Sequence, residues 1–393
     1  MTAARNGKLD VAVVEPVGGH GGMDYYDSGL CEGLSKAGAG VTLYTCDETS
    51  VERGASYRME RPYRGVYGGD PAWRRGLRYV LGSVRALASA RLKRRRIAHF
   101  HFFHVGPLEF FNVLLAKLLG LKVVITAHDV QSFVERLSVP WMSRAAYRLS
   151  DRIIAQSRVS ERELETVLAE PESKIDMIPH GDYRRFIGGV PSQEEARSRI
   201  GVPDNAKVLL FFGQIKEVKG LDVLLDAMPG VIREQPETVL VVAGKVWKDD
   251  FRRYERQIED LGISENCVLH IRYIPDEEVA SYYAAADAVV LPYRRIYQSG
   301  VLLMAMSYGK PVIVSGIEGM TEVVRDGSNG HVFPDGDSEA LSEKIAVALD
   351  EPEELRLVGE RALSYVSEHH DWDRIGEMTS ASYRVALKGR HGQ

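Results

Sequence analysis

A glycine-rich segment near the start of the chain, Gly18 to Gly22, has the composition of a loop that binds phosphate. It follows the apolar stretch DVAVVEP and precedes a helical pattern that begins near Asp24. Gly21 and Gly22 let backbone N–H groups face a ligand, and the positive end of the following helix points the same way. The spacing matches no nucleotide-binding fingerprint, because His20 or Asp24 stands where the dinucleotide pattern needs glycine and no Gly-Lys-Ser/Thr follows. The loop therefore predicts either an anion site or a tight turn that binds nothing.

Three histidines, His99, His101 and His104, have the close spacing of metal ligands. Because side chains alternate along a strand, His99 and His101 point to the same face. The sequence places no carboxylate or cysteine near them that would complete a site, so we expect no metal here.

Residues 73–96 carry nine basic side chains and no acidic one. Apolar residues recur at helical spacing within this stretch, which predicts an amphipathic helix. Two interpretations stay open. The helix packs on a sheet and leaves its basic side in solvent, or it forms an interfacial patch that draws the protein to anionic lipid or to an anionic acceptor. The apolar positions are Trp73, Leu77, Val80, Leu81, Val84, Leu87 and Ala88.

The chain has 393 residues, which predicts two domains rather than one core. Its formal net charge is −5, so no surplus of basic charge indicates a nucleic-acid partner. The three cysteines, Cys31, Cys46 and Cys267, are spaced for neither a disulfide framework nor a zinc site. The first ten residues lack the apolar region of a signal peptide, and no segment is apolar enough to span a membrane. We expect a cytoplasmic protein, peripheral on the inner face of the membrane if residues 73–96 meet lipid.

Short runs rich in Val, Ile and Leu alternate with longer helical patterns along the chain. The runs are apolar on both faces, as in parallel strands that are covered by helices. Repeated strand–helix–strand units predict an α/β fold with two Rossmann-like, doubly wound parallel-sheet domains that face each other across a cleft. The predicted strands are 10–16, 40–45, 97–103, 122–128, 152–157, 174–180, 207–213, 238–244, 267–273, 288–293 and 311–316, and the predicted helices are 105–120, 159–169, 219–234 and 276–285.

A break separates the two series of strands. Residues 183–206 carry glycine, proline and charge but no long apolar run, which is typical of a linker. We predict an N-terminal domain over residues 1–182 and a C-terminal domain over residues 207–365. Residues 366–393 are predicted to form a helix that returns to the N-terminal domain.

An ordered set of motifs in the second half gives the most specific signal. The segment FFGQIKEVKG follows a predicted strand, and VVAGK, YIPDEEVASYYAAADAVVLPY and QSGVLLMAMSYGKPVIV follow in that order. In order and spacing this set resembles the donor domain of the retaining family 4 glycosyltransferases, which have the two-domain GT-B fold. The resemblance continues in the first half at the glycine loop, ITAHD and IPHG, so it covers nearly the whole chain.

The resemblance places the donor diphosphate beside residues 213–220, where the family has G-R-L-x-x-x-K-G. Lys219 matches the family's lysine and is a suitable counter-charge for a diphosphate leaving group. Gln214 stands where the family has arginine, and Lys216 is near enough in sequence to take over that role. The other predicted donor-binding residues are Gly213, Tyr273, Ile274, Gln298, Ser299, Gly300 and Val301, together with Gly21 and Gly22 of the first half.

In the first half, the resemblance assigns His128 and Asp129 to contact with the transferred sugar. A histidine that packs in the core or caps a strand is the alternative for His128. These two residues and Lys219 are the predicted catalytic residues. The acceptor side is predicted to contain His20, Asp24 and Tyr25.

The sequence departs from the family at its hallmark, a pair of glutamates eight positions apart. Ile296 and Met304 occupy those positions, and neither side chain can accept a hydroxyl proton. Gln298 is the nearest polar replacement. The chain is thus similar to a subgroup that lacks the two-glutamate motif, and the departure leaves the identity of the donor sugar open.

We expect a retaining glycosyltransferase that uses a nucleoside diphosphate sugar, with UDP or GDP as the first choices from family frequency, and a carbohydrate or glycolipid acceptor. No cofactor and no metal are expected, because lysine and helix termini supply the counter-charge to the leaving group. Three other classes stay open: a nucleotide-sugar epimerase of the same fold, a noncatalytic nucleotide-sugar binding protein, and an NAD-dependent dehydrogenase.

Overall fold

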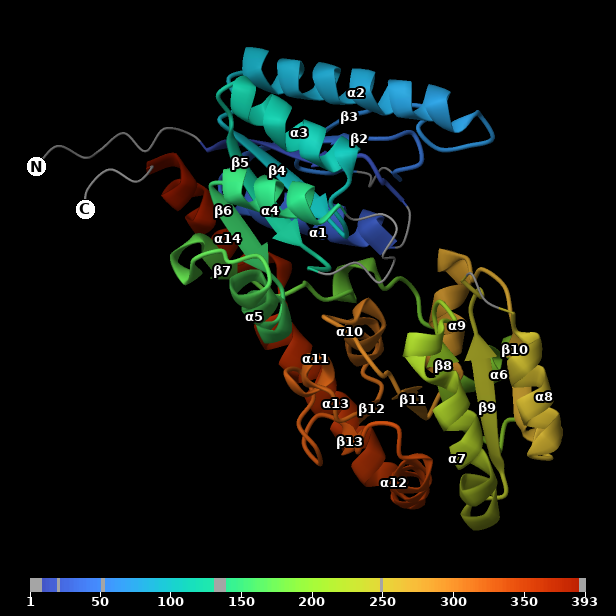
Figure 1. Cartoon of the computed structure of the whole chain (residues 1–393). Helices are drawn as coiled ribbons and strands as arrows, with labels where there is room; N and C mark the ends of the chain where they lie inside the picture. Colours follow the sequence, from blue (N-terminus) through green and yellow to red (C-terminus); the bar gives the residue numbers. More distant parts are fainter. Residues whose placement is uncertain (1–8, 20–21, 51–53, 131–138, 248–249, 389–393) are drawn as a thin grey trace, which may run out of the picture. The chain divides into compact units, whose positions relative to one another are not determined.

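The computed structural model describes residues 9–19, 22–50, 54–130, 139–247 and 250–388. They form two compact units (Figure 1). Unit 1 contains Met1–Gly181 and His370–Gln393, and unit 2 contains Asp182–His369. Each unit is built around a parallel sheet, which confirms the predicted α/β fold with two Rossmann-like sheets.

The sheet of unit 1 has seven strands in the order β3-β2-β1-β4-β5-β6-β7, all parallel. The strand order reverses between β1 and β4, and ligands of doubly wound sheets bind beyond the carboxyl ends of the strands at such a reversal. The strands are β1 (Asp10–Glu15), β2 (Gly40–Thr45), β3 (Arg58–Glu60), β4 (Ile97–Phe102), β5 (Lys122–Ala127), β6 (Arg152–Ala155) and β7 (Ile175–Met177).

Helices cover both faces of this sheet (Figure 1). One apolar core lies between the sheet and the helices α2, α3, α4 and α5, and a second lies between the sheet and the helices α1 and α14. The helices are α1 (Met23–Lys36), α2 (Ala72–Leu92), α3 (Pro107–Leu118), α4 (Pro140–Leu149), α5 (Arg158–Thr166) and α14 (Trp372–Lys388), and a 3-10 turn spans Glu172–Lys174.

Helix α14 completes unit 1 by packing against α1. The two helices approach closely because glycines line the contact. A Cβ atom on Gly29 would overlap the Trp372 ring, and one on Gly33 would overlap the Trp372 carbonyl oxygen. Trp372 is 4% exposed, and Tyr383 of the same helix is fully buried. Residues distant in sequence from the rest of unit 1 therefore supply part of its core.

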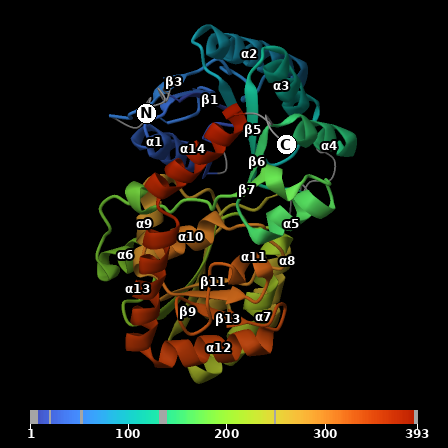
Figure 2. The same ribbon diagram turned by 90° about the vertical axis from the view of Figure 1, so that its left-hand side faces the viewer.

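The sheet of unit 2 has six parallel strands in the order β10-β9-β8-β11-β12-β13, with the reversal between β8 and β11. One apolar cluster joins the sheet to α7, α8 and α12, and α7 lies beside α12 (Figure 2). The strands are β8 (Lys207–Phe212), β9 (Thr238–Ala243), β10 (Cys267–His270), β11 (Ala288–Leu291), β12 (Val312–Ser315) and β13 (His331–Phe333).

The helices of unit 2 connect these strands. They are α6 (Gln193–Ile200), α7 (Leu221–Glu234), α8 (Arg252–Asp260), α9 (Asp276–Ala285), α10 (Gly300–Ser307), α11 (Glu318–Thr321), α12 (Ser338–Asp350) and α13 (Pro352–His369), with 3-10 turns at Arg184–Phe186, Glu217–Lys219 and Ser264–Asn266. None of the helices in the described part of the chain is long and apolar enough to cross a membrane.

Every strand predicted from the sequence is present, and the short strands β3 and β13 are additional. Residues 183–206, predicted as a linker, contain α6 and lie within unit 2, where α6 packs against α9. Helix α6 begins at a capping box in which Ser192 and Glu195 bond reciprocally, and it ends at the left-handed Gly201. These local signals specify a short polar helix that has no apolar run.

Candidate functional site

The predicted donor residues of unit 2 lie in loops that follow the strands. Gly213 follows β8, Tyr273 comes after β10, and Ser299 comes after β11. Since all six strands are parallel, these loops belong to the same edge of the sheet, and β8 and β11 flank the reversal of strand order. Gly213 has a φ of 105°, and a Cβ atom there would lie 3.1 Å from a methyl group of Val301. The loop after β8 and the start of α10 are therefore in close contact.

Tyr293 connects two of the predicted donor elements. The Lys219 ammonium group lies 3.6 Å from the centre of the Tyr293 ring, a cation–π contact. Burial raises the pKa of the Tyr293 phenol, and a hydrogen bond with Ser299 partly offsets that rise. Lys219 and Ser299 therefore lie on one aromatic side chain, although 80 positions of sequence separate them.

The start of α10 has the geometry of an anion site. The Ser299 side chain caps the helix by accepting a hydrogen bond of 3.1 Å from the Leu302 amide. The amides of Gly300 and Val301 belong to the first turn, where backbone N–H groups have no partner inside the helix. A Cβ atom on Gly300 would lie 2.6 Å from the Tyr183 hydroxyl, so glycine is needed for this packing. Two adjacent amides and a nearby ammonium group together can bind a phosphate.

The remaining predicted donor residues have different surroundings. Gln214 is exposed, and Lys216 lies 5.3 Å from the Trp247 ring. Tyr273 is 68% exposed, whereas Ile274 is buried. The Gln298 side-chain oxygen is buried and accepts no hydrogen bond within the described residues. Such an acceptor can receive a bond from a ligand hydroxyl.

The glycine loop of unit 1 is described in part. His20 and Gly21 lie outside the described residues. Gly22 has a φ of 83° and stands directly before α1. The Asp24 carboxylate accepts hydrogen bonds from the backbone amide and the hydroxyl of Ser50, at 3.2 and 3.0 Å. Asp24 thus holds the loop that contains Ser50, while Tyr25 is half-buried on the same helix.

His128 follows β5, and its side chain is buried. Its ring stacks on Phe103 at 4.6 Å and meets Tyr26 edge-on at 4.8 Å. Burial and the neighbouring His101 lower the pKa of His128 well below its usual value, so the imidazole is neutral near pH 7. Its Nε2 atom is buried without a hydrogen-bond partner among the described residues. The adjacent Asp129 is half-buried.

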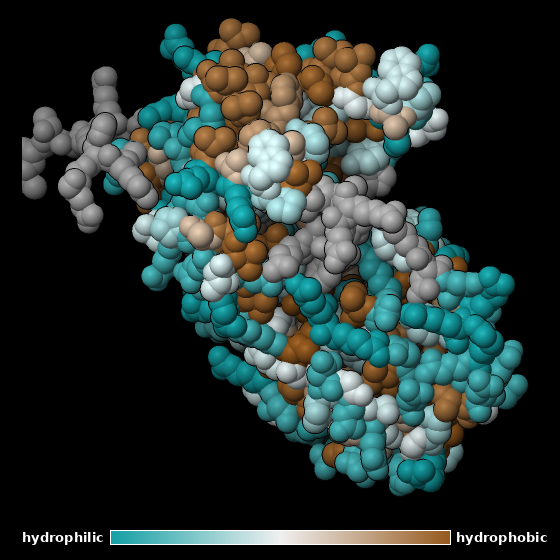
Figure 3. All heavy atoms as spheres, viewed as in Figure 1, coloured by the Kyte–Doolittle hydropathy of each residue, from teal (hydrophilic) through white to brown (hydrophobic). Residues whose placement is uncertain are grey.

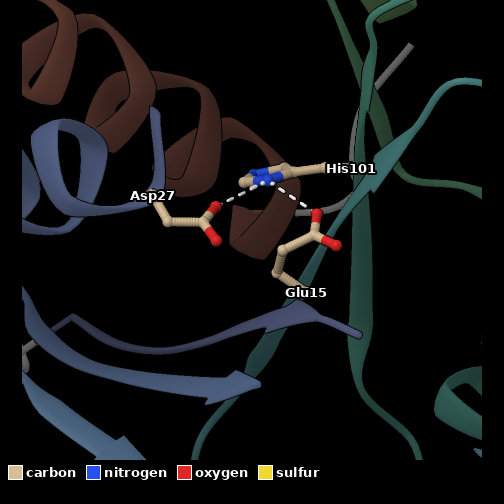
Figure 4. A group of neighbouring side chains, drawn as sticks. All are labelled: Glu15, Asp27 and His101. Atoms are coloured by element: carbon tan, nitrogen blue, oxygen red, sulfur yellow. Dashed lines mark ion pairs between the residues drawn. The ribbon is translucent and has the colours of Figure 1, made fainter. Parts of the chain in front are cut away.

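Among the clustered histidines, His101 has neighbours that the sequence did not predict. Figure 4 shows its Nδ1 atom between Asp27 and Glu15, at 3.2 Å from Asp27 Oδ1 and 3.4 Å from Glu15 Oε2. The expectation that no carboxylate lies near these histidines is therefore wrong. Glu15 ends β1 and Asp27 lies on α1, so only the fold brings them to His101.

His99 has a different role from His101. Its ring nitrogens lie 2.6 Å from the Tyr383 hydroxyl and 2.7 Å from the Thr126 hydroxyl. Burial holds the pKa of His99 well below its usual value. It is a satisfied core histidine that joins α14 to the sheet.

Helix α2 does not pack on the sheet through most of the apolar positions that the sequence predicted as its buried side. Its buried face consists of Tyr79, Gly82, Ser83, Ala86, Leu87 and Ala90, whereas Trp73, Leu77, Leu81 and Val84 are exposed. The helical spacing is correct, but most of the predicted apolar stripe faces away from the sheet. The reason is that small residues and Tyr79 occupy the side that meets α3 and the loop containing Tyr63.

The exposed side chains of α2 belong to a larger apolar area. Figure 3 shows apolar residues gathered over α2 and α3. The α3 helix packs against both α2 and α4. We call this area the α2–α4 patch, and its exposed members are Trp73, Leu77, Leu81 and Val84 of α2, Leu114 and Leu118 of α3, and Trp141 of α4.

Reasoning from sequence missed Tyr293, Glu15 and Asp27. The aromatic residue of the segment LPY, two positions after β11, was a detectable signal for Tyr293, because it follows the strand that flanks the reversal. No sequence pattern indicated Glu15 or Asp27, since their partner, His101, comes from another element.

Comparisons with known proteins agree with this architecture. Residues 192–364 match the family model described as glycosyl transferases group 1, and residues 20–181 match the model described as glycosyltransferase family 4. The D-inositol 3-phosphate glycosyltransferase of Segniliparus rotundus is 26% identical over 95% of this chain and 86% of its own length.

Solved structures resemble the chain in fold. The sucrose-phosphate synthase of Thermosynechococcus elongatus has a TM-score of 0.76 at 20% identity, over 97% of this chain and 100% of its own. HepE of Anabaena, solved in complex with UDP-glucose, has a TM-score of 0.73 at 18% identity, over 95% of this chain and 99% of its own.

Proposed function

Because this chain is a glycosyltransferase of the GT-B type, we propose that it transfers a sugar from a nucleoside diphosphate donor to an acceptor with retained anomeric configuration. UDP is the first choice for the donor nucleotide and GDP the second. The Anabaena neighbour crystallised with UDP-glucose supports UDP. The departing diphosphate assists deprotonation of the acceptor on the same face of the sugar, so catalysis rests on positioning and on charge stabilisation.

The observation that carries the proposal is the grouping of Lys219, Tyr293 and Ser299 at the reversal of the unit 2 sheet. The ammonium group and the first amides of α10 supply two anion-binding groups from different elements. These two anion-binding groups can each bind one phosphate of a diphosphate. Gln298, with its buried unpartnered oxygen, is the proposed acceptor for a donor hydroxyl.

We expect UDP or GDP to raise the melting temperature of the protein. A ligand at one hundred times its Kd adds about 2.7 kcal/mol to the free energy of unfolding, which raises the melting temperature by several degrees. The matching monophosphate should shift the melting temperature little, because it cannot fill both anion sites, and NAD should not shift it. The shift should be the same in EDTA, since lysine and amides supply the counter-charge. Thermal denaturation with a nucleotide panel measures this, and a shift with NAD but with no diphosphate would contradict the proposal.

Turnover separates the transferase from its alternatives. The transferase releases UDP from a UDP-sugar and forms a glycoside when acceptor is present. An epimerase would isomerise the donor without transfer, and a noncatalytic binding protein would show the thermal shift with no release of UDP. The configuration of the product, measured by NMR, tests retention.

We further propose that the α2–α4 patch docks on an anionic membrane surface and that the acceptor is a glycolipid. The patch combines exposed Trp and Leu side chains with the exposed basic residues Arg85 and Arg91 of α2, which form no ion pair within the described part of the chain. Aromatic and aliphatic side chains beside arginines are typical of interfacial binding.

Vesicle binding should depend on this patch. The double variant Trp73→Ala with Leu77→Ala should bind anionic vesicles at least about tenfold more weakly than the wild type, because each lost side chain contributes on the order of 1 kcal/mol of apolar burial. Cosedimentation with phosphatidylglycerol vesicles measures it. Val347→Ala, which removes a 64% exposed side chain of unit 2, is the matched control. Equal binding to neutral vesicles, or no loss in the double variant, would contradict the proposal.

A further inference from the structure

The side chains of Glu15, Asp27 and His101 meet at the reversal of strand order in unit 1, as Figure 4 shows. Glu15 is the last residue of β1, His101 lies near the end of the adjacent β4, and Asp27 lies on α1. One oxygen of each carboxylate faces the same atom, His101 Nδ1. The three side chains are 0 to 1% exposed.

The two carboxylates of this cluster need more hydrogen-bond donors than His101 supplies. His101 Nδ1 carries at most one hydrogen, so it cannot donate a directed hydrogen bond to both carboxylates. Glu15 Oε2 and both Asp27 oxygens make no hydrogen bond within the described residues, and His101 is the one basic side chain there that forms an ion pair with either acid. Buried carboxylates normally have partners, because an unpaired buried charge is costly.

We propose that Glu15, Asp27 and His101 form a site for one divalent metal ion, for which Zn²⁺ has the best fit. Zn²⁺ binds imidazole nitrogen and carboxylate oxygen at about 2.0–2.2 Å, and tetrahedral geometry then separates neighbouring ligand atoms by roughly 3.3 Å. The two separations to His101 Nδ1 are 3.2 and 3.4 Å. The donor atoms of all three residues lie within 4.8 Å of one another.

A divalent ion would also neutralise the negative charge of the two carboxylates. Two ionised carboxylates and a neutral imidazole balance a charge of +2, so the loaded cluster is neutral and one oxygen of each carboxylate gains a partner. One nitrogen and two oxygens form a mixed donor set suited to Zn²⁺, rather than the all-oxygen set that Mg²⁺ and Ca²⁺ prefer. The ion joins β1, β4 and α1, so its role is to fix the strand ends and the first helix of unit 1.

Metal analysis of the full chain tests this site. Protein produced without a histidine tag and dialysed against Zn²⁺, then against metal-free buffer, should retain about one zinc ion per chain by mass spectrometry. The isosteric variants Asp27→Asn and Glu15→Gln should each lose most of it. His99→Gln is the matched control, because His99 is buried on the same strand but bonds to Tyr383 and Thr126 instead. Circular dichroism checks that each variant is folded.

Two further readouts do not depend on activity. Zn²⁺ added to metal-free wild type should raise its melting temperature, and it should not raise that of Asp27→Asn. Co²⁺ in place of Zn²⁺ should give visible absorption bands of tetrahedral intensity. Wild type that retains no metal, or variants that retain as much as the wild type, would overturn the site. Donor binding belongs to unit 2, so the nucleotide panel tests the proposed function separately.

Discussion

Trp372→Ala should lower the free energy of unfolding by about 3–5 kcal/mol, the range for removal of a buried tryptophan. The ring is 4% exposed and contacts Tyr26 at 5.3 Å and His180 at 5.9 Å. Gly29 and Gly181 lie so near that neither tolerates a Cβ atom beside the ring. The cavity left by alanine cannot easily close, because these neighbours belong to two separate segments of the chain, one of them α1. Urea unfolding followed by circular dichroism measures the loss.

Trp141→Ala provides the comparison within the same unit. That side chain is 60% exposed, so its loss should change stability by no more than about 0.5 kcal/mol. Gly29→Ala should also destabilise the protein, since its new methyl group would overlap the Trp372 ring. A loss below about 1 kcal/mol in Trp372→Ala would show that α14 contributes little to the core of unit 1.

Lys219→Ala should reduce kcat/KM for the donor sugar about ten- to hundredfold. In the proposed role of Lys219, the variant removes one charge-assisted hydrogen bond to the diphosphate, worth about 1.5–3 kcal/mol. The Lys219 ammonium group lies over the Tyr293 ring, so in the proposed role its charge is positioned for the leaving group. Steady-state kinetics with the donor identified by the nucleotide panel measure the effect.

Two further variants serve as controls for this test. Lys219→Arg keeps the charge and should recover part of the activity. Lys344→Ala removes a lysine of the same unit that pairs with Asp326 on the surface, and it should leave the kinetics unchanged. Wild-type kinetics in Lys219→Ala would remove this residue from the donor site.

Much of the fold was predictable because parallel strands covered on both faces must be apolar throughout. The runs VAVV, KVVITA and KVLLFF therefore predicted β1, β5 and β8 directly. The strands β3 and β13 have three residues each, too few to show any period. Periodicity also showed that α2 has an apolar stripe, but it does not specify what the stripe faces.

In the candidate site, too, some features could be predicted from the sequence and others could not. Lys219 and Ser299 lie in motifs with fixed local spacing, so they could be named from sequence, and their roles stay predictions. The contact through Tyr293 was not predictable, since it depends on the order of β8 and β11 in the sheet. The group of Glu15, Asp27 and His101 likewise exists only after β1, β4 and α1 have assembled.

The return of α14 to unit 1 has a consequence for how the protein is made on the ribosome. Chains emerge from the N-terminus, and domains generally fold in that order. Unit 1 cannot follow that order, because its second apolar core lacks Trp372, Ile375 and Tyr383 until unit 2 has been translated. At about 5–20 residues per second, the nascent chain exposes the apolar side of α1 for many seconds. Unit 2 can complete its core before unit 1 completes this second core, and chaperone demand should fall on residues 1–181 during that interval.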